Sequence, residues 1–422
     1  MFSFSDSDKT ETAALPTIES RIFSWGIFFL PASALTTSIG PGLTEVLIFL
    51  GTLVYAKHLW RERSRLFGPA IAVLAAFAFN LAAAALSLAL TDFQMRSLDN
   101  PIRELLAVAV IGLIVLHKPQ SDKYWYGVFV GTIGAAGLAL YQRLIMGMER
   151  SAGFNLSIMF GDIAVAMGMM SLASITLFSK TRWALLPYIA FLAGLLTSVL
   201  SGSRGGWITL VVCVIPLYVY GEQETRRRLS LIFGMGLVLF AIIVFIPKFN
   251  VPQRFSDAMV DINQYLLGNV NTSIGSRLEM WKGAWRMFIE NPLLGVGRAN
   301  FHEGLNALIA RKFLSPAVQI YYHAHNDILQ ALATQGLVGG AALGGLYLAP
   351  LRFFLQCWRR HDAAQPYALA GVLLVVSYIV SGLTQVLFAH HLGTAFYAAT
   401  VSVLVGLCLL NKAANARGDS LA

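Results

Sequence analysis

Three cationic or basic side chains lie where the sequence predicts the start of a helix. Arg204 stands between serine and glycine residues directly before an apolar run, and His325 precedes another apolar run. Ser276 and Glu279 form a capping-box pattern, which predicts that Arg277 is the first residue of a helix. A helix N-terminus offers free N–H groups and about half a positive charge. Because guanidinium groups also bind phosphate oxygens in pairs, this pattern predicts a site for a phosphate or diphosphate.

Each of these three residues also has a purely structural interpretation. A lone arginine such as Arg204 commonly reaches the membrane interface, and Arg277 also fits an exposed position on an amphipathic helix. His325 also fits a capping or packing role. The glycines beside Arg204 favour the functional interpretation, because they permit a ligand to approach the backbone closely.

Weaker candidates lie near the same predicted helix ends. Arg298 is either a turn residue or a third phosphate ligand, and Arg143 and Arg150 flank the end of one apolar run. Glu45 and Asp162 stand near helix ends, where a carboxylate is expected to pair with an arginine.

A metal site is an alternative use of the histidines. His323 and His325 are two residues apart, and His390 or His391 lies at another predicted helix junction. No cysteine or carboxylate pattern accompanies them. The sequence also lacks a P-loop, a dinucleotide-binding glycine motif and the zinc-protease motif, and it has no basic patch with aromatic residues that would indicate nucleic-acid binding.

Membrane helices must position these residues. The 422 residues are 56% hydrophobic and 13% charged, whereas soluble proteins carry about 25% charged residues. Apolar runs approach the roughly 20 residues that cross a bilayer. We therefore predict an all-α polytopic membrane protein with about twelve spans, at 21–38, 42–58, 69–90, 102–117, 124–146, 157–178, 183–199, 206–220, 229–246, 326–356, 365–387 and 392–410.

Lysine and arginine predict the orientation of these spans. With the N-terminus in the cytoplasm, 18 of the 31 basic residues lie on the inside and 5 in the short outside connections. This asymmetry follows the positive-inside rule, and it accounts for most of the net charge of +9. The predicted organisation is a cytoplasmic tail (1–20), nine spans (21–246), a periplasmic helical segment (247–325), three spans (326–410) and a second cytoplasmic tail (411–422).

The periplasmic segment shows amphipathic helical patterns and no sign of a separate globular core. Its clearest helix is predicted to begin at the capping box and to end near Asn291 and Pro292. Its apolar face is predicted to consist of Leu278, Trp281, Trp285 and Phe288. Such a helix fits the outer surface of the membrane and can line a site there as well.

Three motifs in order resemble the O-antigen ligase and polymerase superfamily. They are residues 203–205, which open one span, residues 291–297 in the long outside segment, and residues 325–329, which open the next span. The resemblance covers roughly residues 195–345. The single large outside segment between the ninth and tenth of twelve spans is most similar to the ligases that attach O-antigen to lipid A–core.

The resemblance implies a GT-C-like glycosyltransferase of the bacterial inner membrane with its active site facing the periplasm. The donor would be O-antigen on undecaprenyl pyrophosphate, and the acceptor a sugar hydroxyl of lipid A–core. The reaction would be inverting and would need neither metal nor cofactor. His325 matches the family histidine and would act as the base, while Arg204, Arg277, Arg298 and Arg143 would bind the diphosphate and substrate.

Three other activities fit the same residues. An O-antigen polymerase would use a second carrier-linked glycan as acceptor, and a pilin oligosaccharyltransferase would use a protein. A lipid or glycan transporter would bind the substrate without reaction, but the sequence lacks the internal repeat that many transporters show.

Overall fold

The computed structural model describes residues 17–91, 94–203, 205–220, 251–360 and 362–418, with the single positions 227, 230, 234, 236 and 238. Every regular element in these residues is helical. Seven stretches among them are long and apolar enough to cross a membrane, and three shorter apolar helices accompany them. The predicted all-α polytopic fold is therefore confirmed. The count of twelve and the GT-C-like architecture stay predictions, since most of the expected ninth span (229–246) lies outside the described residues.

The helices before the outside segment follow the predicted spans to within a few residues. They are α1 (Ile18–Ala34), α2 (Gly40–Arg61), α3 (Arg63–Phe67), η1 (Gly68–Ala70), α4 (Ile71–Leu90), η2 (Met95–Leu98), α5 (Asp99–Ala107), α6 (Ala109–His117), α7 (Asp122–Leu144), α8 (Ser157–Leu172), α9 (Ile175–Phe178), α10 (Leu186–Ser201) and α11 (Gly205–Tyr220).

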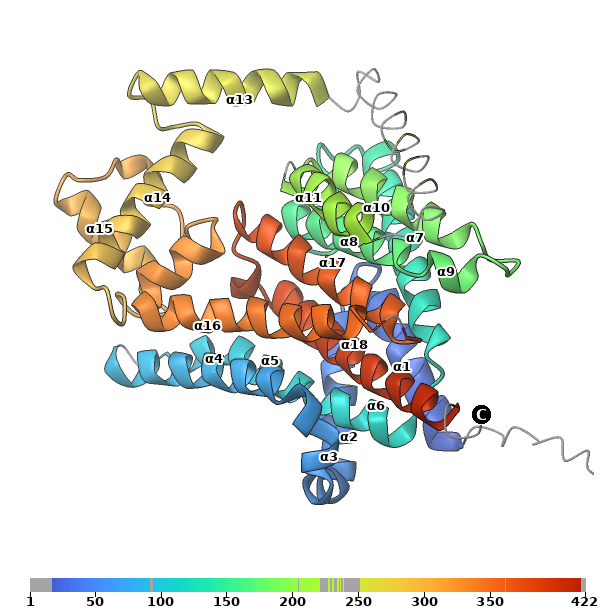
Figure 1. The fold of residues 1–422 in the computed structure, drawn as a ribbon. Coiled ribbons are helices and arrows are strands. Elements are labelled where there is room, and N and C mark those ends of the chain that lie inside the picture. Colours follow the sequence, from blue (N-terminus) through green and yellow to red (C-terminus); the bar gives the residue numbers. More distant parts are fainter. Residues whose placement is uncertain are drawn as a thin grey trace, which may run out of the picture.

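The remaining helices form the segment that the sequence predicts on the outside, called the outside segment below, and the last predicted spans. They are α13 (Val251–Leu266), α14 (Ser273–Glu290), α15 (Phe301–Ala310), η4 (Pro316–Val318), α16 (Asp327–Trp358), α17 (Gln365–Gly382), η5 (Leu387–Ala389) and α18 (His391–Gly418). In Figure 1, α14 and α15 lie beyond one end of α16, and the last turns of α18 lie at the opposite end of the molecule.

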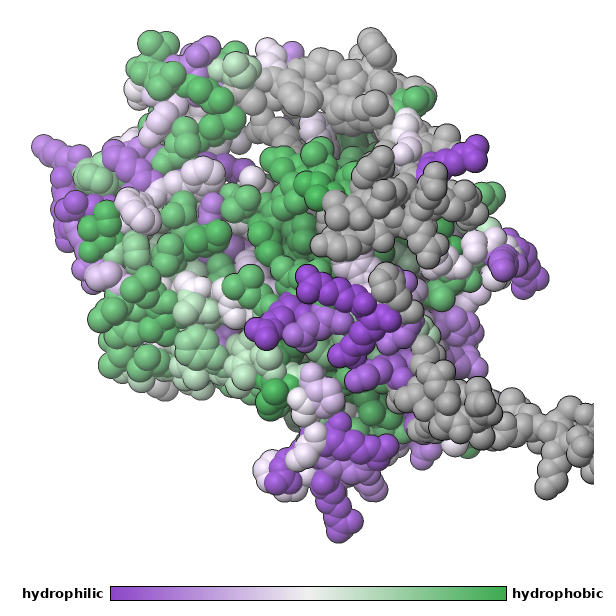
Figure 2. Space-filling view, in the orientation of Figure 1, coloured by the Kyte–Doolittle hydropathy of each residue, from purple (hydrophilic) through white to green (hydrophobic). Residues whose placement is uncertain are grey.

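Helices α17 and α18 lie at the centre of the bundle. The membrane window of α18 is 94% buried, whereas that of α2 is only 6% buried and faces outward. Helices α8 and α10 touch through small residues, because a Cβ on Gly194 would lie 2.5 Å from the carbonyl oxygen of Ala164. Figure 2 shows hydrophobic surface over the α4 and α16 side, with hydrophilic residues gathered around α14–α15 and around α3.

Helix α16 is broken near its outer end. Gly336 adopts φ 61° and ψ −149°, a backbone conformation that residues with a side chain rarely adopt. Residues 337–358 after the break are about 33 Å long and suffice to cross a bilayer. The preceding turns, Asp327–Gln335, therefore form an arm that extends past the span toward α14. We call these residues the outer arm of α16.

A segment of the outside loop fills the break. The N–H groups of Val296 and Gly297 donate to the carbonyl oxygens of Ala333 and Thr334 at 3.0 and 2.9 Å, and the Leu337 N–H donates to the carbonyl of Pro292 at 2.8 Å. These bonds pair the backbone groups that the break leaves open. Residues 291–297, noted in the sequence as a motif, thus dock on α16 through their backbone.

The outside segment has a small hydrophobic core of its own, which corrects the expectation of helices without one. Met280, Met287, Phe301 and Leu305 pack together there with parts of the following loop. This core forms because the buried face of α14 is the one that carries Met280 and Met287. The predicted apolar face is therefore a different face of the helix, on which Trp285 is 50% exposed.

The predicted capping box is also wrong. Helix α14 begins four residues earlier than expected, with Thr272 as N-cap, whose hydroxyl accepts a hydrogen bond from the Gly275 N–H at 3.0 Å. Glu279 instead accepts the Ser315 N–H at 2.9 Å. Arg277 therefore lies in the second turn of the helix and not at its start, whereas the predicted end of this helix near Asn291 is confirmed.

Candidate functional site

His325 is presented by a strained turn immediately before α16. Its φ of 49° lies in the left-handed region, which is uncommon for a residue with a side chain and is often found at functional sites. Asn326 caps the helix as expected, because its side-chain oxygen accepts the Leu329 N–H at 3.0 Å. Its amide nitrogen donates to the carbonyl of Leu383 at 3.0 Å. The cap therefore ties the histidine turn to the segment that follows α17.

A buried amide fixes the ring of His325. The Gln385 side chain is 1% exposed, and its Oε1 lies 2.7 Å from His325 Nδ1. The same oxygen accepts the Val386 N–H at 3.1 Å, which identifies it as the oxygen of the amide. Because that oxygen only accepts, the imidazole donates from Nδ1 and Nε2 is left with its lone pair.

Helix α14 is attached to the same turn. The indole N–H of Trp281 donates to the carbonyl of Ala324 at 2.9 Å. From the other side, the Ala324 N–H donates to the side-chain oxygen of Gln330 on the outer arm at 2.8 Å. Arg277, one turn before Trp281 on α14, is thereby held beside the histidine.

Burial and positive charge keep His325 neutral. Burial and, to a lesser extent, the nearby guanidinium of Arg277 lower its pKa to about 4, against the opposing effect of the hydrogen bond to Gln385. A neutral imidazole with a free Nε2 can accept a proton at neutral pH. Arg277 and His325 therefore lie close enough together for the charge of the guanidinium to act on the imidazole.

Two more histidines adjoin His325. The ring of His323 lies 4.3 Å from that of His325 and 5.4 Å from that of His390, measured between centroids. Burial lowers the pKa of His323 to about 4, and burial also lowers that of His390. Within the described part of the chain, no group of three or more histidine, cysteine or acidic residues could hold a metal ion. The alternative of a histidine metal site thus gains no support.

Arg204 lies outside the described residues, but its neighbours are anchored close to Arg277. Ser203 donates its hydroxyl proton to Asp162 on α8 at 2.5 Å, and Arg150 donates to the Ser201 carbonyl at 2.9 Å. The charge of Arg277 acts on the Asp162 carboxylate as well. The start of α11 and the middle of α14 therefore lie near one another in the fold. Asp162 anchors this turn.

The other two predicted arginines lie elsewhere. Arg143 is buried at the end of α7, where its guanidinium donates to the carbonyls of Met148 and Glu149 and so braces the following turn. Arg298 lies beside the outer arm of α16, with its guanidinium donating to the side-chain oxygen of Gln335 at 2.8 Å. The structure does not bring Arg143 and Arg298 into contact with His325.

Comparison with known protein families matches the region of the chain that carries the three motifs. Residues 189–344 match the family described as O-antigen ligase. Over these residues the chain is similar to the O-antigen ligase superfamily. It is 25% identical to an O-antigen ligase of Escherichia coli K12 over 68% of this chain and 67% of that protein. It is also 28% identical to an uncharacterized protein of Haemophilus influenzae over 74% of this chain and 80% of the relative.

Several residues of the site carry no signal in the sequence. Gln385, Trp281 and Gln330 position the histidine turn, yet none belongs to a motif. Gln385 and Trp281 act through contacts between elements far apart along the chain, whereas Gln330 contacts the turn directly before its own helix. Asp162 was noted as a carboxylate expected to pair with an arginine, and in the structure it accepts a hydrogen bond from Ser203.

Proposed function

We propose that the protein is an O-antigen ligase that transfers polysaccharide from undecaprenyl pyrophosphate to a sugar hydroxyl of lipid A–core at the periplasmic face of the inner membrane. The observation that carries the proposal is the pairing of the His325 base with the Arg277 cation, in a chain similar to this superfamily. Glycosyl transfer from a lipid diphosphate needs a group to accept the hydroxyl proton and positive charge to stabilise the leaving group.

In the proposed reaction, the acceptor hydroxyl gives its proton to Nε2 of His325 while its oxygen bonds to the anomeric carbon. The bond between that carbon and the diphosphate oxygen breaks, and its electron pair leaves with the diphosphate. Arg277 and Arg204 stabilise the charge that develops there. Attack from the face opposite the leaving group inverts the anomeric centre. Gln385 positions the base by holding Nδ1–H.

The test uses the purified full-length protein reconstituted with carrier-linked O-antigen and lipid A–core, with chelator and without nucleotide. Wild type should place glycan on lipid A–core, and His325→Ala should lose at least about 10²-fold in rate, the lower range for a positioned base. Arg286→Ala on the exposed face of α14 is the control that should keep activity. A His325→Ala variant with near-normal turnover would remove the histidine from the mechanism.

The same assay separates the alternatives. Longer glycan that remains on the carrier would indicate a polymerase, and the absence of any new glycosidic bond would favour a transporter. Glycan found only on an added pilin would indicate an oligosaccharyltransferase.

A further inference from the structure

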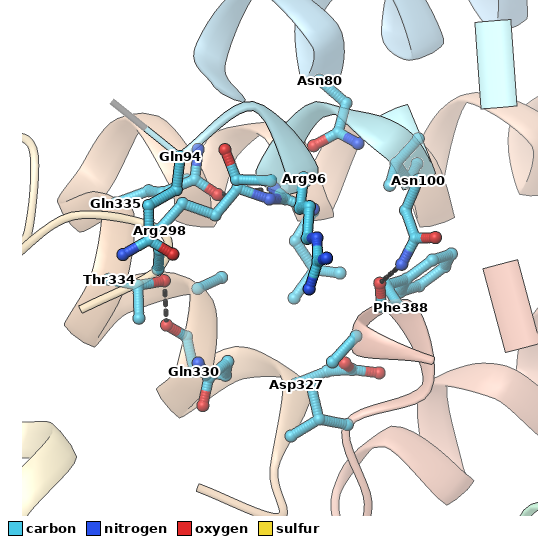
Figure 3. Close-up of a pocket in the computed structure, with 18 residues that line it drawn as sticks. Asn80, Gln94, Arg96, Asn100, Arg298, Asp327, Gln330, Thr334, Gln335 and Phe388 are labelled. Atoms are coloured by element: carbon cyan, nitrogen blue, oxygen red, sulfur yellow. Dashed lines mark hydrogen bonds between the residues drawn. The ribbon is translucent and has the colours of Figure 1, made fainter. Parts of the chain in front are cut away.

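A cavity lies beside the outer arm of α16. It has a volume of about 360 Å³, within the range of ligand pockets. The side chains that line it come from α4, η2, α5, the loop before α15, α16 and η5, and neither His325 nor Arg277 is among them. Figure 3 shows its polar residues around a common space. We call it the amide cavity after five of its residues, Asn80, Gln94, Asn100, Gln330 and Gln335.

One cation in the cavity has no counter-charge. Arg96 points into the space in Figure 3, and within the described part of the chain its side chain makes no ion pair or hydrogen bond. Arg298 differs, because the buried carboxylate of Glu104 balances it. Asp327 also lines the cavity, and its carboxylate accepts a hydrogen bond from the Tyr347 hydroxyl at 3.1 Å.

Two lining residues have unmet hydrogen-bonding capacity. The Gln335 Nε2 and the Ser97 hydroxyl are buried, and neither has a hydrogen-bond partner among the described residues. A buried polar group without a hydrogen-bond partner is energetically costly, so a ligand or solvent molecule that supplies the missing partner is favoured. Amides both donate and accept, as sugar hydroxyls do, and Phe388 adds one aromatic face to the lining.

The cavity shares its walls with the histidine site. Gln330 lines the cavity and also accepts the Ala324 N–H of the histidine turn. Val386 lines the cavity, and its neighbour Gln385 holds the imidazole. A glycan with one residue in the cavity would thus lie within a turn of helix of the reacting centre.

We propose that the amide cavity binds one saccharide residue of a glycan substrate, with Arg96 placed for an anionic substituent on it. This inference rests on the proposed function. The saccharide belongs either to the core acceptor or to the donor chain, and both present the same hydroxyl-rich chemistry.

The test measures binding and turnover separately on the full-length protein in nanodiscs. Calorimetry uses two soluble probes, the delipidated core oligosaccharide and the polysaccharide released from its carrier. Arg96→Ala, and Ala331→Leu, which narrows the cavity, should each weaken binding of one probe roughly tenfold, as expected for a lost polar contact. His325→Ala and the exposed control Arg286→Ala should leave binding within about twofold of wild type. Kinetically, the cavity variants should raise KM for the matching substrate and leave kcat nearly unchanged.

The identity of the affected probe assigns the cavity to acceptor or donor. Unchanged binding and KM in both cavity variants, or no binding of either probe to wild type, would overturn the inference. Transfer that proceeds normally in the cavity variants would overturn it while leaving the ligase proposal intact. Saccharide binding that depends on Arg96 in a protein without transferase activity would support the cavity proposal and contradict the ligase proposal.

Discussion

At the scale of single residues, the neutral amide of Gln385 decides which nitrogen of His325 is free. The imidazole donates from Nδ1 to an oxygen that is itself fixed by the Val386 N–H, so Nε2 is the nitrogen available to a substrate. A carboxylate in the same place would stabilise the imidazolium and raise the pKa of His325, so less of the unprotonated form would be present at neutral pH.

Replacing Gln385 tests this positioning. Gln385→Leu removes the acceptor and should lower kcat roughly tenfold with little change in KM, because the base is no longer oriented. Gln385→Glu restores an acceptor and should recover much of kcat, while its carboxylate raises the pKa of His325 and moves the acid limb of the pH profile upward. Steady-state kinetics between pH 4 and pH 8 measure both effects. Equal profiles for wild type and Gln385→Glu would show that the residue is merely structural.

The pH dependence of wild type follows from the lowered pKa of His325. A base works when unprotonated, so kcat/KM should hold at neutral pH and fall only as the pH drops toward the pKa of about 4. Removing the cation in Arg277→Gln should raise that pKa and shift the acid limb to higher pH, in addition to lowering the rate. An acid limb that stays in place would mean that Arg277 does not act on the base.

The sequence suggested candidate residues by their type but gave no sign of the contacts that hold them. Arg277 and His325 were singled out because each was predicted to lie beside a helix start, which holds for His325 before α16 but not for Arg277, which lies in the second turn of α14. Arg298 carried the same kind of signal, yet it lies with Glu104 and Gln335 at the amide cavity. A motif gives the type of a residue, whereas its partners depend on which distant helices pack against it.

At the scale of elements, helix bounds were predictable because apolar runs are local. The start of α14 was not, since two capping signals lie four residues apart and Glu279 is taken by the Ser315 N–H. The break in α16 was not predictable either. It depends on backbone pairing with residues 292–297, and a single glycine in a glycine-rich helix gives no local sign of it.

The docking of residues 292–297 against the break in α16 can be tested by substituting Gly336. A Cβ on Gly336 would lie 2.3 Å from the carbonyl carbon of Leu293, and its positive φ adds strain. Gly336→Ala should therefore reduce the yield of folded protein severely. Gly344→Ala in the same helix is the matched control, because a Cβ there meets nothing within 4 Å. Size-exclusion profiles and thermal unfolding of the two purified variants provide the measurement. Equal stability of both would contradict the docking of residues 292–297.

At the scale of the whole molecule, basic residues predict which end faces the cytoplasm. The prediction can be tested with impermeant maleimide, because the native Cys213, Cys357 and Cys408 are buried. Arg311→Cys, in the outside segment, should be labelled in intact spheroplasts. Arg65→Cys, on α3, should be labelled only after the membrane is opened. The reverse pattern would invert the topology and place the proposed site in the cytoplasm.

The break in α16 also has a consequence for the insertion of the protein into the membrane during synthesis. A span whose outer end has unpaired backbone groups is costly to release into lipid before those groups find partners. Residues 292–297, which supply the partners, precede α16 in the chain and are synthesised first. In the predicted topology, the loop crosses the membrane before the helix that needs it arrives, so the nascent chain can pair these backbone groups without waiting for a later segment.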